Sequence, residues 1–115
     1  RAGAASALSE TSSEFGGALG IAVMGSIVTA IYRGEIAGTF PPGVPAEAAE
    51  IARGTIGGAV SVASDLPDVM GAEVLDSARE AFAHAFGTTA AISAVIAIGV
   101  ALLAVAMLRR TQASA

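Results

Sequence analysis

Glu10 and Glu14 stand one helical turn apart, immediately before an uncharged, glycine-rich stretch at residues 15–32. An acidic side chain within a membrane costs roughly 2.5 to 3.5 kcal/mol on insertion scales, so such a pair is expected to face a cavity or protein partners rather than lipid. Desolvation and mutual repulsion in that cavity favour the protonated carboxyl group. A pair of this kind can hold a proton in one state and a cation in another, which is the chemistry of proton-coupled cation exchange.

The same two carboxylates also have a simpler interpretation. Glu10 and Glu14 could lie just inside the cytoplasmic headgroups, in the first turns of a helix. There they would interact favourably with the helix dipole and need no functional role. The residues by themselves leave both interpretations open.

Small residues share this predicted helix with the two acids. At 100° per residue, Glu10, Glu14 and Gly17 fall on one stripe, while Ser13, Gly16 and Gly20 fall on a second stripe about a quarter turn away. The second stripe has the G-x-x-x-G spacing that lets membrane helices approach closely. We therefore expect helix packing, more than ligand contact, from Ser13, Gly16, Gly17 and Gly20.

The composition is that of a membrane protein. The 115 residues are 54% hydrophobic and only 14% charged, with a mean hydropathy of +0.71. The absence of cysteine excludes disulfides and thiolate metal sites within the chain. A net charge of −4 without basic clusters argues against nucleic-acid binding. We find no motif of an enzyme and expect no cofactor and no metal.

Hydropathy and proline positions predict an all-α membrane protein with two transmembrane helices. The run at residues 88–108 is uncharged and long enough to cross a hydrocarbon layer of about 30 Å. All four prolines lie between the two apolar stretches. We expect a first transmembrane helix at residues 2–34 and, at 35–68, a long loop with a short helical hairpin broken near Gly57 and Gly58. A long helix at 69–110 containing the final span and a tail at 111–115 are expected to follow.

Arginine placement predicts the orientation. Arg1, Arg109 and Arg110 lie near the two ends, whereas the segment 35–86 contains eight acids and only two arginines. The positive-inside rule then puts both termini in the cytoplasm and residues 35–86 outside. His84, near the outer interface, is expected to have a surface role rather than to relay protons.

The stretch "SALSETSSEFGGALGIAVMGSIVTAIYRGEI" resembles the thirteenth span of the fourteen-span drug/proton antiporters of the major facilitator superfamily, the QacA and EmrB type. The loop and the last span extend the resemblance to nearly the whole chain. It implies the C-terminal two spans of an exporter in the bacterial cytoplasmic membrane, which exchanges protons for lipophilic, often cationic drugs, dyes or quaternary ammonium compounds. It also implies that Glu14 and Glu10 bind substrate or protons, and that the partners are the remaining spans.

Two other functions fit the same residues. The chain could be a small two-span structural or interaction subunit that packs through its glycine stripe. It could also belong to an exporter of the same architecture that carries lipids or metabolites. Because the sequence begins at Arg1 and not at a methionine, we expect it to be a piece of a longer protein.

Overall fold

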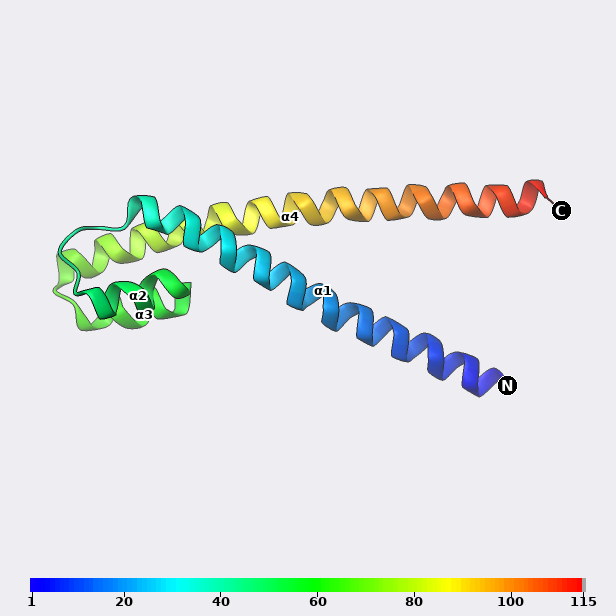
Figure 1. Cartoon of the computed structure of the whole chain (residues 1–115), viewed down its shortest axis with the longest axis horizontal. Coiled ribbons are helices and arrows are strands. Elements are labelled where there is room, and N and C mark those ends of the chain that lie inside the picture. The colour runs from blue at the N-terminus through cyan, green and yellow to red at the C-terminus, as the bar shows by residue number, and fades with distance from the viewer. Residues whose placement is uncertain (115) are drawn as a thin grey trace.

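The computed structural model describes residues 1–114, and over these residues it is helical with no strand. Its helices, in chain order, are α1 (Ala2–Thr39), α2 (Ala46–Gly54), α3 (Ile56–Asp65) and α4 (Asp68–Ala113). The short helices α2 and α3 form a hairpin that packs beside the C-terminal end of α1 and the N-terminal part of α4. The N-terminal end of α1 and the C-terminal end of α4 diverge (Figure 1). The expected all-α class is confirmed.

Local signals explain the boundaries of the hairpin. Pro45 and Pro67 occupy the N-cap positions of α2 and α4, where a missing N–H does no harm. Thr55 caps α3, and its hydroxyl accepts a 3.0 Å hydrogen bond from the amide of Gly58. Between α1 and α2, Gly43 takes a φ of +91°, a conformation that favours glycine.

Both long helices extend beyond the bounds expected from the sequence. Helix α1 continues to Thr39, five residues past the expected limit of 34, and stops before Pro41, which disfavours helix in the residue preceding it. Helix α4 continues to Ala113, into the expected tail at 111–115, of which residue 115 lies outside the described part. The hairpin break lies at Thr55, two residues before the pair Gly57 and Gly58 near which it was expected, because the threonine cap starts a new helix there.

Every buried residue among residues 1–114 lies at the hairpin end, in a region we call the head: helices α2 and α3, residues 32–39 of α1 and residues 68–89 of α4. Most of the core is alanine, so the helices approach closely. Tyr32 is its largest side chain, and its hydroxyl donates a 2.8 Å hydrogen bond to the carbonyl of Ala52 in the last turn of α2. The core residues are Tyr32, Ile36, Ala52, Ala59, Val62, Val74, Ala78, Ala81 and Ala85.

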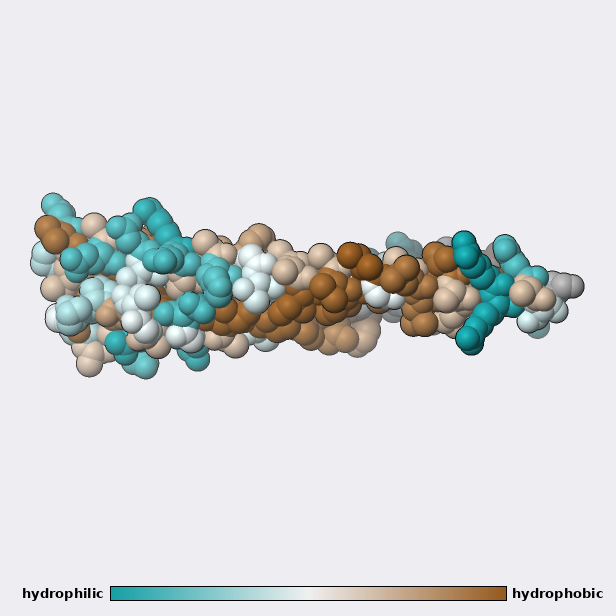
Figure 2. All heavy atoms as spheres, turned by 90° about the horizontal axis from the view of Figure 1, so that it is seen from above, coloured by the Kyte–Doolittle hydropathy of each residue, from teal (hydrophilic) through white to brown (hydrophobic). Residues whose placement is uncertain are grey.

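Beyond the head, the two long helices are apolar and exposed. Both are long and apolar enough to cross a membrane. At about 1.5 Å per residue, the 46 residues of α4 extend roughly 69 Å, more than twice a hydrocarbon layer of about 30 Å. Polar residues gather at the two ends of the molecule and apolar residues along its middle (Figure 2). The head therefore stands outside the layer that the middle can span.

Two glycines allow the close approach of the head helices. A Cβ at Gly58 would lie 2.3 Å from the carbonyl oxygen of Ile51, and a Cβ at Gly71 would lie 2.5 Å from that of Ala63. Both neighbours are backbone atoms, which cannot swing away as the end of a side chain can. These positions therefore require glycine for packing between α2 and α3 and between α3 and α4.

We predict that Gly71→Ala destabilises the head by about 1–3 kcal/mol, because α3 and α4 must separate to admit the methyl group. The measurement is the rate of trypsin cleavage after Arg53, which rises as local unfolding exposes the α2–α3 hairpin. Gly87→Ala on the same helix is the matched control, since its Cβ would meet nothing within 4 Å. Equal cleavage of the two variants would contradict the packing described for Gly71.

Candidate substrate and proton site

The structure places both candidate acids on the N-terminal half of α1. Glu10 and Glu14 are exposed, and the helix that carries them has already diverged from α4 (Figure 1). A Cβ at Gly16, Gly17 or Gly20 would meet nothing within 4 Å, and Ser13 is exposed as well. Within the described residues, none of the sequence-predicted site residues is brought against another helix.

The depth of the two acids follows from the register between α1 and α4. Near the head, the Oγ of Ser77 donates a 2.9 Å hydrogen bond to the carbonyl of Thr39. Farther down, the Oγ of Ser93 lies 3.3 Å from the Sδ of Met24. Between these contacts α1 advances by fifteen residues and α4 by sixteen, so the helices run antiparallel with nearly matched rise.

Continuing this register separates the two acids in depth. With residues 88–108 filling the hydrocarbon layer, Glu14 lies at about the level of Leu103, roughly 7 Å inside the edge of that layer far from the head. Glu10 lies at about the level of Met107, next to the interface that Arg109 marks. Because α1 diverges from α4, it advances less per residue along the direction of α4. Both acids therefore lie deeper in the hydrocarbon layer than the matched register alone would place them. The headgroup interpretation thus suits Glu10 better than Glu14.

The space between the diverging helices is apolar. A groove of about 370 Å³ lies where α1 leaves α4, and its lining residues are Ile21, Met24, Gly25, Val28, Phe86, Thr89, Ala90 and Ser93. The hydroxyls of Thr89 and Ser93 each donate a 2.8 Å hydrogen bond to a carbonyl one turn earlier on α4. Their protons are therefore not available to a ligand. This groove therefore offers apolar contact and no free hydroxyl to a cation.

Sequence reasoning did not single out the Met24 and Ser93 contact. The available signal was a pair of hydroxyls, Thr89 and Ser93, four residues apart in an otherwise apolar run. Two residues four apart lie on the same face of a helix, so this pair is consistent with a face of α4 that packs on another helix. Which residue of α1 it meets depends on the head, which sets the register from outside the membrane.

His84 has a partner on the other long helix. Its Nδ1 lies 3.2 Å from the Oε1 of Glu35, with 62% and 46% of the two side chains exposed. An exposed pair of this kind contributes about 0–1 kcal/mol when the histidine is charged. The geometry links α1 to α4 at the surface of the head and leads to no other titratable group of the candidate site.

The difference in depth predicts different reactivity toward a hydrophobic carbodiimide, which dissolves in the bilayer and modifies protonated carboxyl groups. In membranes that contain the full-length protein, Glu14 should be labelled faster than Glu10, as measured by mass spectrometry of the peptides. Glu10 serves as the internal control because it lies on the same helix. Equal rates at the two positions would show that the register between α1 and α4 does not set their depths.

Known bacterial proteins are similar to nearly the whole of this chain. The chain is 41% identical over 110 residues, 96% of its length, to the multidrug efflux pump LfrA of Mycolicibacterium smegmatis. It is 32% identical over 104 residues, 89% of its length, to the methyl viologen resistance protein SmvA of Salmonella typhimurium. It spans about a fifth of the length of these relatives, 21% in each case.

No protein-family model and no solved structure matches the chain. The assignment therefore depends on the two curated relatives, which align with nearly all of the present sequence. The resemblance to drug exporters noted in the sequence is confirmed: this chain is a relative of one segment of the bacterial multidrug efflux proteins.

Proposed function

We propose that this chain is the C-terminal two-span segment of a proton-coupled exporter of lipophilic cations in the bacterial cytoplasmic membrane. The observation that carries the proposal is the contact between Met24 and Ser93, because continuing its register puts Glu14 opposite a point about five residues inside the inner end of the apolar run at 88–108. A carboxyl group at that depth needs a polar interior or a bound ligand. The similarity to efflux proteins supports other spans as the source of that interior.

In this proposal Glu14 is the group that alternates between a proton and a substrate cation. A carboxylate in a low-dielectric site attracts a cation strongly, and a proton on the same group removes the charge that the cation would meet. Protonation and cation binding therefore exclude each other at one carboxyl group. This competition is the physical basis of exchange between the two ligands.

Glu10 is the second group, one turn nearer to the cytoplasmic surface. At the level of the interface it is accessible to water, so it attracts cations toward the site more than it binds them in a desolvated state. The roles of the two acids thus differ by depth. The small residues Gly16, Gly17, Gly20 and Ser13 leave open faces of α1 on which other spans pack closely.

The charge of the substrate is inferred from two observations. The name of the methyl viologen resistance protein SmvA refers to an aromatic dication with two quaternary nitrogens. The α1 segment of the present chain carries Glu10 and Glu14 next to apolar surface. An acidic group beside apolar walls suits a lipophilic cation better than a neutral lipid or metabolite.

The proposed orientation has both termini in the cytoplasm and the head outside. Arg1, Arg109 and Arg110 then lie on the inner side, in agreement with the positive-inside rule. The head is packed like a water-soluble domain and is acidic, so it suits an extracellular position over the outer ends of the spans. Protons and cationic drugs are the transported partners, and no nucleic acid or enzyme activity is involved.

We predict that Glu14→Gln in the full-length transporter lowers the export rate of a cationic dye about tenfold, which corresponds to the loss of about 1.4 kcal/mol of cation stabilisation. Export of a neutral lipophilic compound should be much less affected. Dye efflux from energised cells, normalised to the amount of transporter in the membrane, measures the effect.

Glu10→Gln is the matched control, and its effect should be smaller because the residue lies near water. Equal loss for the cationic and neutral compounds in Glu14→Gln would refute the cation-binding role. Normal export of both would remove Glu14 from the mechanism.

A further inference from the structure

Two arginines that are twenty residues apart in sequence line one cleft at the base of the head. Arg33 extends from α1, Arg53 from the last turn of α2, and the cleft of about 230 Å³ is completed by Glu50 and Gly54. Arg53 is held over the ring of Phe40, with its Cζ 4.7 Å from the ring centroid. Neither guanidinium makes an ion pair with a carboxylate in the part of the chain described, residues 1–114.

This arrangement is unexpected in a segment as acidic as the head. The residues from 35 to 86 carry eight acids, so carboxylate partners are abundant. The two arginines are nevertheless gathered beside a single acid, Glu50, in one cleft. Two guanidinium groups and one carboxylate together match a ligand that carries a phosphate and, beside it, a cationic amine.

The depth of the cleft indicates where such a ligand comes from. By the register of α1 with α4, Thr29 lies at the level of Thr88, where the hydrocarbon layer begins. Arg33 is one turn farther out, roughly 6 Å beyond that edge. The headgroup layer of a bilayer is about 5–8 Å thick on each side, so Arg33 lies at the depth of lipid phosphates.

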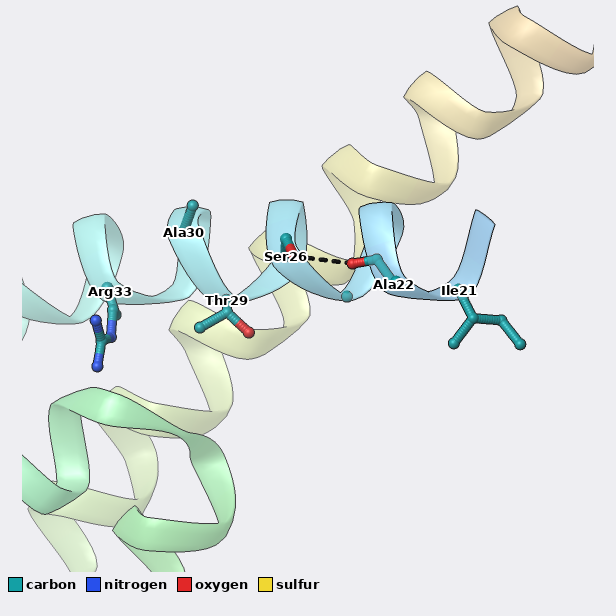
Figure 3. Close-up of a pocket in the computed structure, with 7 residues that line it drawn as sticks. Ile21, Ala22, Ser26, Thr29, Ala30 and Arg33 are labelled. Atoms are coloured by element: carbon teal, nitrogen blue, oxygen red, sulfur yellow. Dashed lines mark hydrogen bonds between the residues drawn. The ribbon is translucent and has the colours of Figure 1, made fainter. Parts of the chain in front are cut away.

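Below the cleft, one face of α1 is open and consists mostly of small residues. Arg33 borders a shallow hollow of about 710 Å³ on this face, which extends along α1 as far as Ile21 and which we call the small-residue groove (Figure 3). From Arg33 to Ile21 the helix extends roughly 18 Å, close to the thickness of one hydrocarbon leaflet of about 15 Å. The lining residues are Ile21, Ala22, Gly25, Ser26, Thr29, Ala30 and Arg33.

We propose that α1 and α2 form a binding site for one outer-leaflet phospholipid with an amine-bearing headgroup. Arg33 and Arg53 bind its phosphate, Glu50 accepts a hydrogen bond from its ammonium group, and one acyl chain lies along the small-residue groove of α1. If another span packed in this groove instead of a lipid, the two guanidinium groups would lack an anion unless that span carried an acidic residue. The proposal requires the membrane orientation given above and a face of α1 that no other span covers, and it is independent of export.

The test is native mass spectrometry of the full-length protein in detergent, titrated with phosphatidylethanolamine or with phosphatidylglycerol. The native protein should bind phosphatidylethanolamine more tightly. Replacing both arginines, by Arg33→Gln and Arg53→Gln, should weaken this binding about tenfold, because both side chains are exposed and each ion pair with the phosphate contributes less than about 1 kcal/mol. Glu50→Gln should abolish the preference between the two lipids while retaining phosphate-dependent binding of both.

Arg79→Gln is the matched control, because Arg79 is the remaining arginine of the outer segment and does not line the cleft. It should bind phosphatidylethanolamine like the native protein. Circular dichroism of each variant confirms that the helices are retained. Excess inorganic phosphate should not displace the lipid, because the acyl chain contributes to binding.

Three results would overturn the proposal. The first is unchanged lipid binding in the double arginine variant. The second is equal binding of the two lipids by the native protein. The third is disulfide crosslinking of a cysteine at Ala30 to another span of the same protein, which would show that a helix and not a lipid fills the groove. None of these experiments measures dye export. A result that contradicts the lipid site therefore leaves the export proposal untouched, and the reverse also holds.

Discussion

The hydrophobic effect acts only where water is displaced, and this limit governs the structure of the chain. Burial ends at Tyr32 on α1 and at Thr89 on α4, the level at which the apolar run begins. Outside that level, α2 and α3 pack on the long helices around an alanine-rich core. Beyond that level α1 and α4 diverge (Figure 1). In a membrane, lipid solvates apolar side chains as well as protein does, so burying them between the two helices would add little stability. The head is thus what joins the two spans.

The packing of the head in turn sets the geometry of everything below it. Tyr32 holds α1 to the end of α2 through its bond to the Ala52 carbonyl, and Gly71 lets α3 lie directly on α4. These contacts fix the register at which Met24 meets Ser93. Packing in the head therefore determines which level of α4 lies opposite Glu14.

The surfaces left open by this arrangement have different chemical characters. The groove between α1 and α4 is apolar, and its two hydroxyls are already bonded to their own helix. The face of α1 below Arg33 is lined with small residues and ends in a cleft with two guanidinium groups. The proposed site around Glu14 is incomplete without other spans, as expected of a chain that covers about a fifth of its efflux relatives. Only the lipid site proposed at Arg33 and Arg53 is formed within the segment.

The sequence alone determined the helical class, the two apolar helices, the hairpin between them and the resemblance to drug exporters. These features are local: they follow from hydropathy over about twenty residues, from proline positions and from the run around Gly16 and Gly20. The roles of Glu10 and Glu14 stay predictions. Tertiary structure decided which levels of α1 and α4 coincide, and it brought Arg33 beside Arg53. Sequence patterns could not supply either result, because helical periodicity gives the face of each residue but not the register between two helices, which packing between distant segments sets.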